Sequence, residues 1–218
     1  MLSFVKFIQS SVFLSFIVAS GAVAFSQELL NGVEARYGSA ARTRVVAWQQ
    51  LMVDIAESSN DDLTKIKRAN DFFNRVKWIS DQEHWGLEDY WATPIETLAT
   101  NGGDCEDFSV GKYFTLQNTD FDIDKIRITY VKALDFNQAH MVLAYYATPD
   151  AEPLILDNIN KTILPASERK DLLPIYSFNG ESLWLARASA RKIPINVKQT
   201  LPQWSELNER IMRELSKD

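Results

Sequence analysis

Apolar positions recur at helical spacing in the first third of the chain and again at its end. In residues 40–57 and 62–78 they fall three and four positions apart, which predicts two helices. Asp61 or Asp62 is expected to cap the second of these helices. Residues 104–117 and 202–216 are expected to form two more helices, the last of them amphipathic.

Residues 79–103 have no regular period, apart from a short helix expected at Pro94–Thr100. A loop of this length in a compact domain is usually functional or ordered by its own packing. The aromatic-rich part, residues 85–94, is therefore a candidate surface for docking a partner, and packing of the loop on itself is the alternative.

The pattern changes to a period of two after residue 125, which predicts strands. The longer strands are expected at residues 126–131, 139–147 and 154–158, with turns at 135–138 and 148–153. Shorter strand segments are expected near residues 162–164, 175–178 and 183–186. Helices first and an antiparallel sheet afterwards indicate an α+β fold.

The first 24 residues have a different character from the rest. Residues 7–23 carry no charge, and Ala22-Val23-Ala24 fits the small-residue pattern of a signal cleavage site. We expect residues 1–24 to be a signal peptide for export and residues 25–218 to be one domain. An uncleaved membrane anchor is the alternative.

The charge balance excludes two classes of partner. Lys6 is the only charged residue in the first 24, so the remaining chain has 22 basic and 29 acidic residues. No basic stripe is available to neutralise phosphates, which argues against nucleic acid. The same acidity argues against an anionic membrane surface.

The chain has a single cysteine, Cys105, which cannot form an internal disulfide. It lies in Gly102-Gly103-Asp104-Cys105-Glu106-Asp107, where Asp104 is expected to be the N-cap of a helix and Asp107 its capping partner. Cys105 would then be the first helical residue, where the helix dipole favours a thiolate and free N–H groups can hold an oxyanion. The structural alternative is a capped helix with a small buried residue at its start.

His140 follows at the start of an expected strand, and Asp157 at the end of the next. Antiparallel pairing would bring the two side chains together. Cys105 as nucleophile, His140 as base and Asp157 as orienting acid would form a catalytic triad. The alternative for His140 is a structural histidine in the core, with its hydrogen bonds made to neighbouring residues. Trp91 and Asn101 are weak candidates for the second oxyanion donor.

The carboxylates of Asp104, Glu106 and Asp107 would disfavour a thiolate at Cys105. A calcium ion bound to these hard oxygen ligands would remove the penalty. From these residues alone, the favoured alternative is that the acids complement the positive end of the helix.

The motif Gly103-Asp104-Cys105-Glu106-Asp107, together with His140 and Asp157, resembles the bacterial transglutaminase-like cysteine proteinases, and among them the periplasmic LapG-type proteases. The resemblance extends over nearly all of residues 25–218. It implies a papain-like or transglutaminase-like core, in which the cysteine helix packs on an antiparallel sheet that carries the histidine and the aspartate. It also implies a calcium requirement, with Asp104 and Glu106 as ligands and Asp107 as a further one.

The resemblance also implies partners. The substrate would be a large repeat-containing surface adhesin, cut near its N-terminus between small residues to release biofilm. The regulator would be an inner-membrane cyclic-di-GMP receptor that sequesters the protease through its periplasmic domain. Two other functions stay open: a transglutaminase or amidase with the same thioester chemistry, and a calcium-binding module without catalysis.

Overall fold

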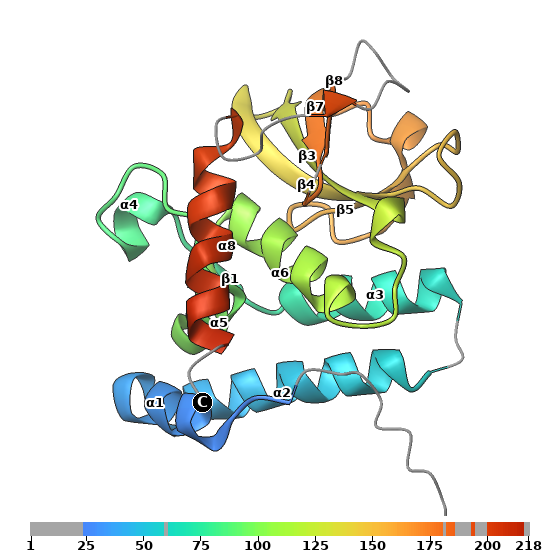
Figure 1. The fold of residues 1–218 in the computed structure, drawn as a ribbon. Helices are drawn as coiled ribbons and strands as arrows, with labels where there is room; N and C mark the ends of the chain where they lie inside the picture. Colours follow the sequence, from blue (N-terminus) through green and yellow to red (C-terminus); the bar gives the residue numbers. More distant parts are fainter. Residues whose placement is uncertain (1–23, 59–60, 181, 186–192, 195–199, 216–218) are drawn as a thin grey trace, which may run out of the picture.

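The computed structural model describes residues 24–58, 61–180, 182–185, 193–194 and 200–215. The predicted signal peptide, residues 1–24, lies outside these ranges except for Ala24. The expected α+β fold is confirmed: an antiparallel sheet covers α6, and the other helices pack on the far side of α6 and along its flank (Figure 1). No helix in the described ranges has the length and apolarity needed to cross a bilayer.

The helices largely follow the apolar spacing of the sequence. Their bounds are α1 Gln27–Tyr37, α2 Ser39–Ala56, α3 Asp62–Phe73, α4 Asp81–His84, α5 Pro94–Thr100, α6 Cys105–Gln117 and α8 Pro202–Leu215, with short 3-10 turns η1 Ile123–Lys125 and η2 Ala166–Glu168. The sequence analysis did not anticipate α1 or the four-residue α4. Asp61 caps α3 by accepting a hydrogen bond from the Thr64 N–H at 2.8 Å.

The prediction of one helix over residues 62–78 was wrong at its C-terminal end. The helix ends at Phe73, and Lys77–Trp78 form a short strand, β1, that pairs in parallel with β2 at Gly102–Gly103. Val76 is buried and lies in a turn after the helix, where its backbone N–H donates to the Phe73 carbonyl at 2.9 Å. The apolar pattern therefore continues beyond the helix, and it reports burial rather than helical geometry.

The large sheet has the strand order β6-β5-β4-β3-β7-β8-β9, with antiparallel pairing throughout. Its strands are β3 Ile126–Ala133, β4 Gln138–Tyr145, β5 Leu154–Leu156, β6 Leu164–Pro165, β7 Leu172–Phe178, β8 Ser182–Leu185 and β9 Ile193–Pro194. The three longer predicted strands are confirmed with shifted ends, and β9 was not expected. β3 and β4 form the centre, paired over their whole length from Ile126 opposite Tyr145 to Ala133 opposite Gln138.

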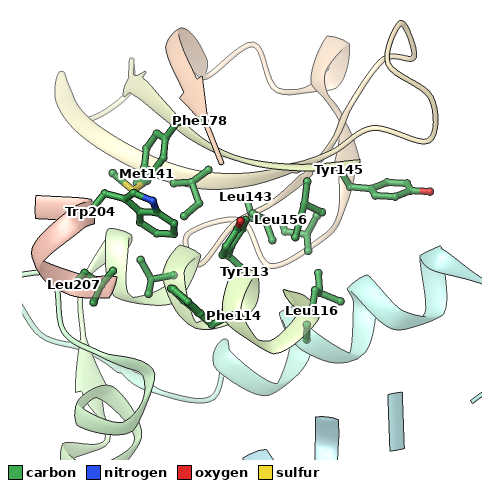
Figure 2. Packing of buried hydrophobic residues seen from close by; sticks show 14 of the residues in the cluster. Tyr113, Phe114, Leu116, Met141, Leu143, Tyr145, Leu156, Phe178, Trp204 and Leu207 are labelled. Atoms are coloured by element: carbon green, nitrogen blue, oxygen red, sulfur yellow. The ribbon is translucent and has the colours of Figure 1, made fainter. Parts of the chain in front are cut away.

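The main core lies between α6 and the sheet. Tyr113 of α6 points toward apolar side chains of the strands, among them Leu143, and Trp204 of α8 closes the side of the cluster (Figure 2). On the other side of α6, a Cβ at Gly111 would lie 2.1 Å from the Phe73 ring. The missing side chain lets α3 approach closely, and α6 is therefore held between the sheet and the helices below it.

Candidate active site

Cys105 is the first residue of α6, as the sequence predicts. The Asp104 N–H before it donates to Oδ2 of Asp107 at 3.3 Å, the reciprocal bond expected of a capping pair. Gly103 makes this possible, because a Cβ there would lie 2.6 Å from the same carboxylate oxygen. The local sequence therefore places the thiol at the positive end of the helix dipole.

Ser109 joins the first turn of α6 to β4. Its hydroxyl lies 3.0 Å from the carbonyl oxygen of Cys105 and 3.0 Å from that of Met141, and it can donate to either. The backbone of Met141 also lowers the pKa of the Cys105 thiol, in opposition to burial and the neighbouring acids. Since Met141 follows His140, the sulfur lies beside the strand that carries the predicted base.

His140 and Asp157 are brought together as predicted. β4 and β5 pair with Leu143 opposite Leu156, and the chain leaves β5 directly before Asp157. Nε2 of His140 lies 2.8 Å from Oδ1 of Asp157, and both side chains are buried. Because Nε2 is engaged, Nδ1 is the ring nitrogen left to exchange a proton with the thiol.

Asp157 is held by more than the histidine. Its Oδ1 also accepts the Ile159 N–H at 3.0 Å, and its Oδ2 accepts Nη2 of Arg169 at 2.7 Å. Burial alone would raise the pKa of Asp157, but the bonds and charge of His140, with Ile159 and Arg169, lower the pKa well below its usual range. Asp157 is therefore a carboxylate, suited to fix and stabilise an imidazolium.

Arg169 is a site residue that the sequence analysis missed. Besides Asp157, it binds Asp171 through Nε at 3.0 Å and Nη2 at 2.7 Å, and it is 3% exposed. It lies in the polar run Ser167-Glu168-Arg169-Lys170-Asp171, which looks like a solvent-exposed loop. No local signal distinguishes it there, because its partner is defined only by the tertiary fold.

Cys105 and His140 line one open cleft of about 520 Å³ at the end of the sheet where β3 and β4 meet. Large apolar side chains stand around it and are widely exposed: Trp78 at 62%, Phe136 at 60% and Ile159 at 49%. An exposed apolar rim beside Cys105 and His140 offers a binding surface for an extended peptide.

The acids beside Cys105 lie together with a fourth, Asp81 of α4, that the sequence analysis did not select. Oxygens of Asp81, Asp104 and Asp107 lie within 4.8 Å of one another, and Glu106 approaches both Asp104 and the pair Asp81 and Asp89. Burial and neighbouring carboxylates raise the pKa of Asp81 to about 6 and of Asp104 to about 8. The pKa values of Glu106 and Asp107 are also raised, chiefly by burial.

These acids act on the thiol in the direction that the sequence suggested. Burial raises the pKa of Cys105 well above its ordinary value, and the charges of Glu106 and Asp104 raise the pKa further. The sulfur lies 3.0 Å from Oε2 of Glu106, to which the thiol donates. The uncompensated acids therefore keep the nucleophile protonated.

A family model described as bacterial transglutaminase-like cysteine proteinase matches residues 40–181. The chain belongs to this family. The match contains Cys105, His140 and Asp157, and it makes the chain a cysteine proteinase. No curated protein matches the chain.

Solved structures of a transglutaminase-like proteinase from Legionella pneumophila, LapG, are similar over almost the whole chain. The EGTA-treated structure is 38% identical, with a TM-score of 0.74, covering 87% of this chain and 99% of LapG. The calcium-bound structure is 39% identical, with a TM-score of 0.71, covering 84% of this chain and 98% of LapG. The fold is therefore transglutaminase-like, and calcium is bound by at least one relative.

The proteinase has residues that fit a calcium ion beside Cys105. Oδ1 of Asp81 and Oδ1 of Asp104 are buried and have no hydrogen-bond partner among the described residues. Clustered carboxylate oxygens are the hard ligands that calcium prefers, and a divalent cation would neutralise charges that now oppose one another. Asp107 already accepts the Ala92 N–H at 2.7 Å and the Asp104 N–H, so it also has a structural role.

Other residues considered from the sequence lie elsewhere. Trp91 is buried with its indole N–H bonded to Asp89 at 3.1 Å, and neither it nor Asn101 lines the cleft of Cys105. Residues 85–94 pack on the domain: Trp85 lies against Tyr90 with ring centroids 4.9 Å apart, Tyr90 packs under Arg210 of α8, and Trp91 stacks on Phe178 in the core. Among the described residues, the exposed aromatic side chains are Trp78 and Phe136, on the rim of the cleft.

Proposed function

We propose that this proteinase is a calcium-dependent periplasmic endopeptidase that cleaves a large surface adhesin near its N-terminus. One observation carries the proposal: Cys105 and His140 line the same open cleft, and His140 is bonded to buried Asp157. Family membership supports the cysteine chemistry, and the calcium-bound relative supports the metal.

The residues divide the reaction among them. His140 accepts the thiol proton through Nδ1, and the Cys105 sulfur attacks the scissile carbonyl carbon. Backbone N–H groups at the start of α6 stabilise the oxyanion. The imidazolium then protonates the leaving amine, and water hydrolyses the thioester with His140 as base. Asp157 holds Nε2 throughout, and Arg169 keeps Asp157 in place.

Calcium would be held by Asp81, Asp104 and Glu106, with Asp107 beside them. A bound calcium ion supplies positive charge next to the thiol, which offsets the carboxylates and favours the thiolate. Glu106 has the most direct effect, because its Oε2 now accepts the thiol hydrogen. Asp81 comes from α4 and the other acids come from the N-cap and first turn of α6, so the same ligand set would also fix the loop after β1.

The proposed substrate fits the shape of the cleft. An unstructured segment with small side chains can pass close to Cys105, while the exposed side chains of Trp78 and Phe136 in the cleft lining contact the chain. The same exposed rim would give the periplasmic domain of a cyclic-di-GMP receptor a surface to bind, and binding there would block Cys105 directly. Export of the chain by its first 24 residues is part of this proposal.

Cleavage of an N-terminal adhesin fragment tests the function. The purified proteinase with calcium should cut the fragment at one position, located by mass spectrometry. Cys105→Ala and His140→Ala should abolish cleavage while their circular dichroism spectra stay unchanged. Cutting by either variant would refute the mechanism. Incorporation of a labelled amine into glutamine residues, without cleavage, would instead establish transglutaminase activity.

A further inference from the structure

A second cavity lies on the opposite face of the sheet from α6. Side chains alternate along a strand: Ile126 and Ile128 of β3 belong to the core against α6, whereas Arg127 and Thr129 line this cavity. Its volume is about 210 Å³, and its walls are largely apolar, including Val142 of β4. An apolar cavity of ~150 Å³ can hold benzene, so this one has room for a benzene-sized group with a short polar arm.

Arg127 is the distinctive residue of this cavity. Its guanidinium lies between the rings of Tyr146 and Trp184, 4.1 Å from each centroid, and Arg127 is only 7% exposed. No carboxylate of the described residues forms an ion pair with it, and its Nε is buried without a hydrogen-bond partner in this part of the chain. Among the residues that the structure describes, no acidic side chain lines the cavity. A buried cation held in place without a counterion favours an anionic ligand.

The chemistry of the walls narrows the ligand. The planar fork of an arginine matches a carboxylate, which it can bind through two parallel hydrogen bonds. Arg127, Arg169 and Tyr146 line the cavity together with the hydroxyls of Thr129 and Ser177, which lie 3.1 Å apart. Most of the remaining wall is aliphatic. The combination fits a carboxylate on an apolar body better than a phosphate or a sugar, which would need more donors.

Arg169 connects this cavity to the catalytic residues. It lines the cavity, and its Nη2 binds Oδ2 of Asp157, whose Oδ1 binds His140. Its Nη1 is buried and has no partner among the described residues. A group that enters the cavity therefore lies one residue away from the Asp157 carboxylate, on the side opposite the histidine.

We propose that the cavity around Arg127 is a binding site for a small apolar carboxylate, and that Arg169 transmits its occupancy to Asp157 and His140. Binding itself is independent of the catalytic activity. The effect on the enzyme rests on the proposed function, because it requires His140 and Asp157 to act in the reaction.

The binding part can be tested with 3-phenylpropionate and its amide, 3-phenylpropionamide, which differ in charge but hardly in shape. Titration followed by ligand-observed NMR should give a dissociation constant at least about tenfold lower for the carboxylate, since hydrogen bonds to charged groups are the stronger ones. Arg127→Gln should remove this preference. Ala144→Leu, which fills the cavity from β4, should weaken both probes.

Equal binding of the two probes by the unmodified protein, or no binding of either, would overturn the site. This comparison does not depend on whether a variant folds.

The link from the cavity to His140 is tested by a separate signal. The chain has two histidines, so the imidazole resonances can be assigned with His84→Gln. The carboxylate should shift the His140 resonance in the unmodified protein and leave it in place in Arg127→Gln. A bound probe without that shift would refute the link through Arg169, while leaving both the site and the proteinase assignment intact.

Discussion

Without calcium, this proteinase should become less stable as the pH rises from 5 to 7. Asp104 has its pKa raised to about 8 and Asp81 to about 6, from an ordinary value of 3.8. At pH values between the ordinary and the raised pKa, the folded state binds more protons than the unfolded state. The free energy of unfolding therefore falls with increasing pH. Calcium should remove this dependence, because it takes the place of the protons between the carboxylates.

The size of the effect follows from the number of protons. One proton retained only by the folded state changes the free energy of unfolding by about 1.4 kcal/mol per pH unit, or about 2.7 kcal/mol across this range. Asp104 is partly exposed, so we expect about 1–2 kcal/mol after screening. Burial also lowers the pKa of His84 from 6.5, which offsets part of this change within the range. The range ends at pH 7 because buried Lys112, whose pKa is lowered to about 7 by burial, has the opposite effect at higher pH.

The assay is urea unfolding in a reducing buffer at a series of pH values, once with EGTA and once with calcium. Stability should fall with pH in EGTA and stay nearly level in calcium. Asp104→Asn should flatten the EGTA curve and weaken the response to calcium. A level or rising EGTA curve, or identical curves with and without calcium, would refute the assignment of these acids to one ion site.

Three further changes test separate parts of the structure. Asp157→Asn should lower turnover strongly without abolishing it, because the residue orients His140 and does not react; unchanged turnover in a cleavage assay would contradict this role. Arg169→Met leaves the Asp157 charge buried with fewer partners and should cost about 3–5 kcal/mol in urea unfolding, with Arg169→Lys costing less. Gly111→Ala forces a Cβ to within 2.1 Å of the Phe73 ring and should cost about 1–3 kcal/mol. Phe73→Leu should recover part of that loss in the double variant, and strict additivity would argue against the contact.

The sequence predicted best what depends on neighbouring residues. The capping pair of Asp104 and Asp107 and the cap at Asp61 are local patterns, and each forms as expected. The proximity of His140 and Asp157 could also be predicted, because antiparallel pairing brings the start of one strand beside the end of the next.

Residues whose partners are set by the tertiary fold could not be predicted from the sequence. Asp81 lies on a four-residue helix inside a stretch without period, and it reaches the other acids only through the folding of the loop. Arg169 has the sequence environment of a surface loop and is nevertheless buried against Asp157. The helix predicted over residues 62–78 was too long for the same reason, since Val76 is buried by tertiary packing without being helical.

The most direct test of the account is alkylation of Cys105 by iodoacetamide, measured by mass spectrometry across pH with calcium and with chelator. The chain has one cysteine, so the mass shift reports that residue alone. We predict rapid labelling in calcium at pH values below the ordinary thiol pKa, slow labelling in chelator, and a smaller difference between the two in Glu106→Gln. Slow labelling in both conditions, or labelling that chelator does not change, would contradict a thiolate favoured by a calcium ion at the start of α6.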